Sequence, residues 1–430
     1  MQMKIYRYPN KEEWTEILKR PAFDSKGLET KVSSILNDIR ERGDAALRDY
    51  EREFDHVELS SLKVSDEEFE AACAAIDPKL KAAIDKAVEN IACFHQSQQI
   101  PDQKIQTAPG VTCWQKSVGI ERVGLYVPGG TAPLFSTVLM LGVPAFIAGC
   151  RERILCTPPG KDGRIHSAIL YAARQAKITA VYKLGGVQAI GAMAYGTETV
   201  PSVYKIFGPG NQYVTMAKQL VSLKDVAIDM PAGPSEVEVI ADATTNPAFA
   251  AADFLSQAEH GADSQSLLVT NTPEFIPSFI AEVERQLSAL PRKDLASMSL
   301  SHSKIILLST KEDVMDFTNA YAPEHLIIQT SDYLDLAQAV RNAGSVFLGP
   351  YTPESAGDYA SGTNHTLPTN GYAKSYSGVN LDSFIRKITF QEITSKGLLE
   401  LGPVIEIMAE TELLDAHKRA VSIRCNAITQ

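Results

Sequence analysis

The segment FLSQAEHGADSQ, residues 254–265, places an amide, a carboxylate and an imidazole within four residues. On a helix, Gln257 and His260 share a face, so their side chains can converge on one point. Glu259 points elsewhere and is expected to face solvent or to support the other two. A histidine with one further ligand is half of a zinc site, although an amide is an uncommon zinc ligand. The same residues could equally form the polar end of an ordinary helix, and the spacing alone leaves both interpretations open.

Other segments could complete such a site. Asp358 lies in a stretch rich in Gly, Ser, Tyr, Asn and Thr, residues 351–378, and His417 lies in ELLDAHKR. A loop of this length inside a compact protein is more often functional than not. The remaining histidines are interpreted as surface or packing residues (His56, His95, His166), as lacking an obvious partner (His302), or as further candidates (His325, His365).

The segment YAPEHLII, residues 321–328, sets Glu324 beside His325, after a helix-breaking proline and before an apolar strand. An adjacent carboxylate and imidazole suit proton transfer near neutral pH, because histidine titrates in that range and a carboxylate can activate water. The alternative is a polar loop cap. The pair also precedes its strand, whereas ligands in open parallel sheets usually bind beyond the carboxyl ends of the strands.

Three glycine turns follow expected strands: YVPGGT (126–131), LGGVQ (184–188) and FGPGNQ (207–212). Glycine allows close approach of a ligand to the backbone, and the helix that follows offers free N–H groups to a phosphate. The dinucleotide fingerprint GxGxxG is incomplete, because GPGNQY has Tyr213 at the third glycine position. Phosphate or dinucleotide binding and simple tight turns therefore remain as alternatives.

The composition is that of a globular protein: 430 residues, 44% hydrophobic and 22% charged. A net charge of −11 without a Lys/Arg cluster argues against a general nucleic-acid binder. The six cysteines show no CxxC spacing and are expected to be reduced and mostly buried. The first residues contain no apolar signal region, and the longest apolar run, VLMLGVPAFIAGC, is too short to span a bilayer, so a cytoplasmic location is expected.

The order of the expected elements predicts an α/β fold. Residues 1–103 show helical periodicity and form an N-terminal helical arm, with a capping box at Ser65 and Glu68. Strands then alternate with helices over 104–235, and the alternation restarts over 236–370, which predicts two parallel-sheet halves. Residues 371–430 form a short C-terminal tail that we expect to serve dimerisation.

The motifs together closely resemble the histidinol dehydrogenase family. They occur in the family's order over residues 20–425: ERVGLYVPGG, LGGVQAI, FGPGNQYVTMAK, IDMPAGPSEV, LSQAEHGADSQ, YAPEHL, SAGDYASGTNHTLPT, YSG and ELLDAHKRA. The resemblance implies two aldehyde-dehydrogenase-like, incomplete Rossmann-like halves in an intertwined homodimer. It also implies NAD and Zn²⁺ as cofactors. Departures are mild: Arg386 stands where lysine is usual and Asn380 where serine is common, which we expect to affect packing.

The resemblance also implies site residues and their roles. Zinc ligands would be Gln257, His260, Asp358 and His417, the last from the partner subunit, and the acid–base pair would be Glu324 and His325. NAD would contact Tyr126, Gln188 and Asn211. The substrate would contact Ser235, Glu412, His325 and the zinc ligands.

The implied reaction is a four-electron oxidation of L-histidinol through L-histidinal to L-histidine with two NAD molecules. His325 would remove the hydroxyl proton, and Glu324 would activate the water that adds to the aldehyde. One alternative is a related zinc- and NAD-dependent dehydrogenase of another small polyol, such as a sulfonated propanediol. Glu412 favours histidinol, because a sulfonate would call for Arg or Lys. A zinc hydrolase without nucleotide and a non-catalytic dimeric scaffold are further alternatives.

Overall fold

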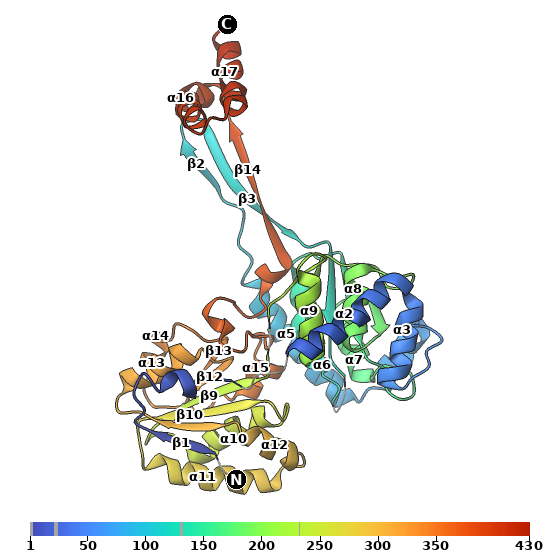
Figure 1. Ribbon diagram of the computed structural model, residues 1–430, viewed down its shortest axis with the longest axis vertical. Coiled ribbons are helices and arrows are strands. Elements are labelled where there is room, and N and C mark those ends of the chain that lie inside the picture. The colour runs from blue at the N-terminus through green and yellow to red at the C-terminus, as the bar shows by residue number, and fades with distance from the viewer. Residues whose placement is uncertain (1–2, 21–24, 130–131, 232) are drawn as a thin grey trace. The chain divides into compact units, whose positions relative to one another are not determined.

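The computed structural model describes residues 3–20, 25–129, 132–231 and 233–430. The chain divides into two compact units, which are described separately (Figure 1). The first unit comprises Met1–Gln98 and Ile120–Phe384, and the second comprises Gln99–Gly119 and Ile385–Gln430. Among the described residues, no helix combines the length and the apolar character that a membrane span requires.

The first half of the larger unit is built on a five-stranded parallel sheet in the order β6-β5-β4-β7-β8. Its strands are β4 (Arg122–Tyr126), β5 (Glu152–Thr157), β6 (Ala180–Lys183), β7 (Lys205–Phe207) and β8 (Ala227–Ile228). Its connecting helices are α6 (Phe135–Ile147), α7 (Ser167–Gln175), α8 (Gly186–Tyr195) and α9 (Gln212–Ser222). The strand order reverses between β4 and β7, which is where a parallel sheet leaves a crevice at its carboxyl edge.

The second half is built on a six-stranded parallel sheet in the order β1-β11-β10-β9-β12-β13. Its strands are β1 (Lys4–Arg7), β9 (Glu236–Ala241), β10 (Gln265–Thr270), β11 (Lys304–Leu307), β12 (His325–Ile328) and β13 (Ser345–Leu348). Its helices are α10 (Pro247–Ala258), α11 (Phe275–Ala289), α12 (Lys293–Leu300), α13 (Lys311–Tyr321), α14 (Tyr333–Gln338) and α15 (Glu354–Tyr359). The prediction of two parallel-sheet halves is confirmed.

The N-terminal helices pack against the first half. Helices α2 (Ser25–Arg42) and α3 (Asp44–Tyr50) contact α8, and α5 (Pro78–Gln96) contacts α6 (Figure 1). Helix α4 (Asp66–Ala75) contacts α7. Ser65 caps α4 by accepting a hydrogen bond from the Glu68 N–H, as its capping-box sequence predicts. The prediction of helices over residues 1–103 missed β1, which extends the second sheet by pairing with β11. In the second half, the sequence analysis missed helix α12. A short helix, α1 (Trp14–Ile17), follows β1.

The second unit is a three-stranded antiparallel sheet and a helical hairpin. Strands β2 (Lys104–Ala108), β3 (Val111–Gly119) and β14 (Ile385–Ile393) pair in the order β14-β3-β2. Helices α16 (Ser395–Thr411) and α17 (Asp415–Thr429) pack against each other. All six cysteines of the chain are free; three are buried, whereas Cys93 is exposed.

Candidate active site

Glu324 and His325 are both held by the backbone of one residue. His325 opens β12, the strand next to β9, and Glu236 opens β9. The Glu236 N–H donates to Glu324 Oε2 at 2.8 Å, and the Glu236 carbonyl lies 3.2 Å from His325 Nδ1. His325 is 3% exposed and Glu324 6%. The pair therefore lies at the amino edge of the second sheet, as its position before an apolar strand predicts.

Glu236 is fixed in turn by Arg20, a residue that sequence reasoning missed. Arg20 donates from Nε to Glu236 Oε1 at 2.5 Å and from a terminal nitrogen to Glu236 Oε2 at 2.9 Å. It also donates to the carbonyl of Tyr321 at 2.8 Å. Both partners of this bidentate pair are largely buried, so removal of either would leave an uncompensated charge. No sequence pattern connects Arg20 with Glu236.

Gln257 lies on α10 with one polar atom free. Its Nε2 donates to Glu354 Oε1 and lies 3.0 Å from His325 Nδ1, while its buried Oε1 lacks a hydrogen-bond partner among the described residues. The helix predicted over 247–260 ends at Ala258, so His260 lies in the turn that follows it and not on the helix. The His260 N–H donates to the Gln257 carbonyl at 3.1 Å. An unpartnered buried carbonyl oxygen is costly unless a ligand satisfies it.

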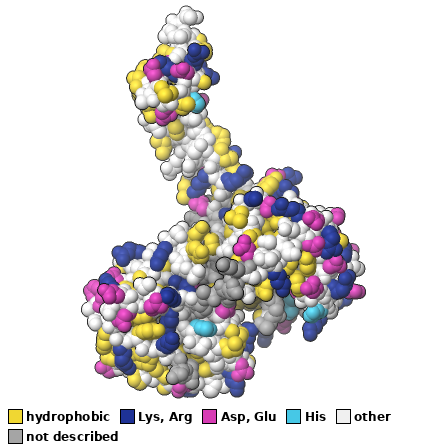
Figure 2. Space-filling view, viewed as in Figure 1, with side chains coloured by type: hydrophobic (Ala, Val, Ile, Leu, Met, Phe, Trp, Pro, Cys, Tyr) yellow, Lys and Arg dark blue, Asp and Glu magenta, His cyan; other side chains and the backbone are white. Residues whose placement is uncertain are grey.

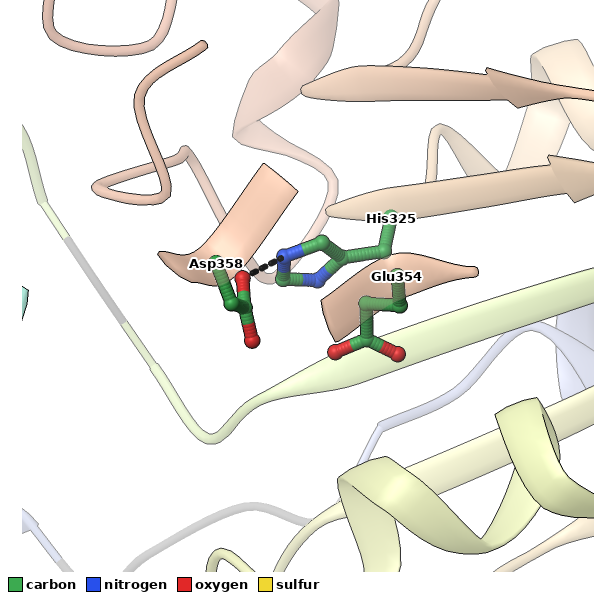
Figure 3. A group of neighbouring side chains, drawn as sticks. All are labelled: His325, Glu354 and Asp358. Carbon is green, nitrogen blue, oxygen red and sulfur yellow. Dashed lines mark ion pairs between the residues drawn. The ribbon is translucent and has the colours of Figure 1, made fainter. Parts of the chain in front are cut away.

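Figure 3 shows the side chains of His325, Glu354 and Asp358 converging. One atom of each that could bind a metal lies within 4.8 Å of the other two. Glu354 and Asp358 lie four residues apart on α15 and so share a helix face. His325 Nε2 lies 3.6 Å from Asp358 Oδ1, and Glu354 Oε2 accepts from the Ser256 hydroxyl at 2.9 Å. Sequence reasoning missed Glu354, although the spacing of the two carboxylates in ESAGD could have revealed it.

Buried carboxylates dominate the electrostatics of this cluster. Burial works against charge on His325, but Glu354, Glu324 and Asp358 outweigh it and raise the pKa of His325 well above its usual range. Burial raises the pKa of Glu354 to about 8, against the opposing effect of His325. Burial would also raise the pKa of Asp358, but the hydrogen bond and charge of His325, with His365 and His260, lower it. Carboxylates confined around one imidazole favour a bound cation.

Every predicted site residue of the first unit lines one of two cavities. The smaller cavity, of about 730 Å³, is bordered by Ser235, Gln257, His260, Glu324, His325 and Asp358. The larger, of about 1700 Å³, is bordered by Tyr126 and Gln188. Pro128 and Asn211 line both cavities, so the two cavities adjoin at these residues.

The larger cavity lies at the carboxyl edge of the first sheet. Tyr126 ends β4, and its hydroxyl oxygen accepts from the Gly186 N–H at 3.1 Å. Asn211 caps α9 by accepting from the N–H groups of Tyr213 and Val214 at 3.0 and 3.1 Å. These contacts fix the second and third glycine turns, whereas Gly130 and Thr131 of the first turn lie outside the described residues. The NAD contacts expected of Tyr126, Gln188 and Asn211 stay a prediction.

His365 links the two halves. Its Nδ1 lies 3.0 Å from the Asp358 carbonyl oxygen, and its Nε2 lies 3.2 Å from the hydroxyl of Thr137 on α6. Burial lowers the pKa of His365, although Asp358 opposes that effect. The two remaining predicted site residues, Glu412 and His417, are exposed residues of the second unit. The first unit by itself therefore supplies three of the four predicted zinc ligands.

Comparison with solved structures defines the fold class. An acetylating aldehyde dehydrogenase from Geobacillus thermoglucosidasius superposes with a TM-score of 0.51 at 12% identity, covering 88% of this chain and 94% of that chain. At this identity the similarity concerns the fold alone: the chain has an α/β fold of the aldehyde-dehydrogenase-like class.

Closer similarities identify the family. The family model described as histidinol dehydrogenase matches residues 18–425. A histidinol dehydrogenase from Bacteroides thetaiotaomicron is 63% identical over 99% of this chain and 100% of its own length. One from Pectobacterium atrosepticum is 51% identical over 97% of this chain and 95% of its own length. The crystal structure of histidinol dehydrogenase from Elizabethkingia anophelis superposes with a TM-score of 0.97 at 52% identity, covering 100% and 99% of the two chains. The chain belongs to the histidinol dehydrogenase family and is an oxidoreductase.

Proposed function

We propose that the protein oxidises L-histidinol through L-histidinal to L-histidine, using NAD and zinc. Family membership supports the substrate. The observation that carries the proposal is the placement of Glu324 and His325 beside Gln257 and Asp358, in a cavity that shares Asn211 with the larger cavity. In this proposal the acid–base pair, the metal ligands and the dinucleotide site adjoin one another, as a metal-assisted alcohol oxidation requires.

The donor set fits zinc. Gln257 presents its unpartnered Oε1, and Asp358 and His260 border the same cavity. Glu354 accepts a hydrogen bond from the amide nitrogen of Gln257, so the Oε1 of Gln257 points away from Glu354. We therefore assign Glu354 to orienting Gln257 rather than to binding the metal. When bound, zinc would orient the donor atoms of the substrate, and NAD would accept hydride from the substrate carbon.

His325 is the proposed base for the alcohol. In its reactive form we propose a neutral imidazole with the proton on Nδ1, directed at the Glu236 carbonyl, so that Nε2 is the acceptor. That nitrogen is buried without a hydrogen-bond partner among the described residues, and it takes the substrate hydroxyl proton in each oxidation. A cation bound beside Glu354 and Asp358 would oppose the rise in the pKa of His325 that these carboxylates cause. Glu324, anchored through Oε2 by the Glu236 N–H, keeps Oε1 for the water that adds to the aldehyde.

We further propose a homodimer formed through the second unit. Val404, Ile407 and Met408 lie on one face of α16 and are exposed, as is Ile423 on α17; Figure 2 shows hydrophobic side chains on the surface of this unit. An exposed apolar face of this kind indicates a protein interface. Ile407→Glu is expected to convert the dimer into monomers in sedimentation or light scattering. Lys396→Glu, an exposed position on the same helix, should leave the dimer intact, and equal behaviour of both variants would contradict this interface.

Shared active sites can be tested by mixing two inactive variants. If His417 of the partner subunit completes each zinc site, a mixed dimer of His325→Asn and His417→Asn chains contains one intact site. Refolding a one-to-one mixture should then restore about a quarter of the wild-type activity, because half of the dimers are mixed. No recovery would show that each chain uses its own His417.

The proposed reaction is tested by incubating the purified protein with NAD, zinc and L-histidinol and following NADH. We expect two NADH per L-histidine formed. Turnover of a sulfonated propanediol but not of L-histidinol would overturn the proposal. Calorimetry with NAD alone separates a dehydrogenase from a zinc hydrolase, because a hydrolase would show no NAD binding.

A further inference from the structure

Two carboxyl groups from the N-terminal helices reach the larger cavity. They are Glu51 and Asp55, at the two ends of η1 (Glu51–Asp55), a π-helical turn that continues α3. Such turns are rare and occur often at functional sites. Asp55 borders the cavity together with Gln188, and Glu51 lies behind them with 0% exposure.

These groups form one hydrogen-bonded cluster around the second glycine turn. Glu51 Oε1 accepts from Gln188 Nε2 at 3.0 Å and from the Gly185 N–H at 3.2 Å. Asp55 Oδ2 accepts from the same amide nitrogen of Gln188 at 3.3 Å. The Oε1 of Gln188, which is 1% exposed, has no partner among the described residues. The buried Oε2 of Glu51 also has no partner among the described residues, so the cluster is buried with two polar atoms still to be satisfied.

The cluster is anionic and lacks a cation. None of the described ion pairs includes Glu51 or Asp55. Burial and the neighbouring Asp55 raise the pKa of Glu51 to about 8; burial also raises the pKa of Asp55, while Glu51 and His56 lower it. Asp55 is the carboxyl group that borders the cavity, and the Gln188 amide nitrogen, which donates to both carboxyl groups, ties it to Glu51.

Dinucleotide-binding sheets usually place such an acceptor at the end of the strand next to the first glycine turn, where it binds a ribose hydroxyl. Here that strand is β5, and it is followed by Pro158 and Pro159, which offer no side-chain acceptor. Asp55 lies against this position: a Cβ added to Gly185 would be 2.8 Å from Pro158 Cβ and 3.2 Å from Asp55 Oδ2. The N-terminal helices thus supply a carboxylate that the strand end lacks.

We propose that Asp55, supported by Glu51 and Gln188, accepts a hydrogen bond from the 2′-hydroxyl of the adenosine ribose and selects NAD against NADP. A 2′-phosphate at this point would meet a carboxylate instead of an arginine, so repulsion adds to the lost hydrogen bond. This inference rests on the proposed use of a nicotinamide dinucleotide, and it assigns the N-terminal helices a part in cofactor specificity.

The test compares Asp55→Asn with Glu58→Gln, a matched loss of charge at an exposed carboxylate that borders the same cavity. Dissociation constants for NAD and NADP are measured by calorimetry without histidinol, and NADH formation is then measured at saturating NAD. We expect Asp55→Asn to weaken NAD roughly tenfold and to reduce the NAD-over-NADP preference at least as much, with kcat unchanged. Glu58→Gln should change neither the NAD dissociation constant nor the NAD-over-NADP preference. An unchanged preference in folded Asp55→Asn would overturn the proposal.

A second measurement uses the unaltered protein, in case Asp55→Asn does not fold. Wild-type protein should bind NAD that lacks the adenosine 2′-hydroxyl roughly tenfold more weakly than NAD, and equal binding would refute the role of Asp55. If the protein binds NAD with this preference but does not oxidise L-histidinol, the proposed substrate is wrong and the assignment of Asp55 stands. If the protein binds no dinucleotide, both the proposed function and the assignment of Asp55 are wrong.

Discussion

The two α/β halves use opposite edges of their sheets. In the first half, the larger cavity lies beyond the carboxyl ends of β4, β6 and β7 and is shaped by backbone, through glycine turns and helix N-termini. In the second half, Glu236 and His325 stand at the amino ends of β9 and β12, and the site depends on buried charged side chains. The cavity of the first half is therefore shaped mainly by backbone, and the candidate site of the second half mainly by buried charged side chains.

The carboxyl edge of the second sheet explains part of this difference. Thr245 accepts from the Asp242 N–H and donates to the Gln329 carbonyl, and Gln329 Nε2 in turn donates to Asp253 at 2.5 Å. Side chains at this edge therefore bond to the backbone and to one another, although Gln329 Oε1 has no partner among the described residues. Two sheets of similar topology can therefore carry their sites at opposite edges, because side chains can fill one edge of a sheet and place charged groups at the other.

His325→Asn should cause the largest loss, because it removes the proposed base from the second half. We expect turnover of L-histidinol to fall by about three orders of magnitude. Zinc content and the NAD dissociation constant should stay unchanged, since Gln257, His260 and Asp358 remain. The exposed His302→Asn serves as control. Loss of zinc in the His325 variant would mean that this residue is a ligand and that its role as base is wrong.

Glu324→Gln should separate the two oxidations. The amide oxygen of glutamine can still accept from the Glu236 N–H, so the geometry is kept while the carboxylate that activates water is lost. We expect oxidation of L-histidinal to fall roughly a hundredfold and oxidation of L-histidinol to fall less. Single-turnover rates with each substrate measure this. Equal losses in both steps would remove the water-activating role.

Gly208→Ala tests the first half's dependence on backbone. Gly208 has a φ of +126°, and an added Cβ would lie 2.0 Å from the Tyr126 carbonyl oxygen. The turn must shift, so we expect the KM for NAD to rise roughly tenfold and the protein to lose about 2 kcal/mol of stability. Gly27→Ala is the control, because its Cβ would meet nothing within 4 Å. Unaltered NAD binding in Gly208→Ala would show that this turn does not shape the cofactor site.

Sequence reasoning succeeded where a local pattern carries the information. Strand–helix alternation predicted both sheets, and adjacency or spacing singled out Glu324, His325 and Gln257. It failed where tertiary contacts alone bring residues together: β1 joins β11 across most of the chain, and Arg20 reaches Glu236 over 216 positions. Asp55 was missed for the same reason, because the helical sequence around it suggested only packing. No periodicity in a single sequence encodes such pairs.

The smallest expected effect concerns a buried carboxyl group of the second half. Glu238 on β9 is 0% exposed and accepts from the Thr318 hydroxyl; burial raises its pKa to about 8 from an ordinary value of 4.5. The folded protein therefore holds a proton that the unfolded chain releases. Its contribution to stability is fully present below pH 4.5 and is lost as pH rises to about 8.

Glu238→Gln keeps the neutral form at every pH, so its free energy of unfolding should fall less between pH 5 and pH 8. We expect a relative gain of about 1–2 kcal/mol at pH 8, measured by urea denaturation at both pH values. The exposed Glu284→Gln should follow the wild type. Parallel pH profiles for Glu238→Gln and wild type would show that Glu238 is ionised in the folded protein. Buried charge in the second half would then extend beyond the candidate active site, and the second half would differ still more from the first.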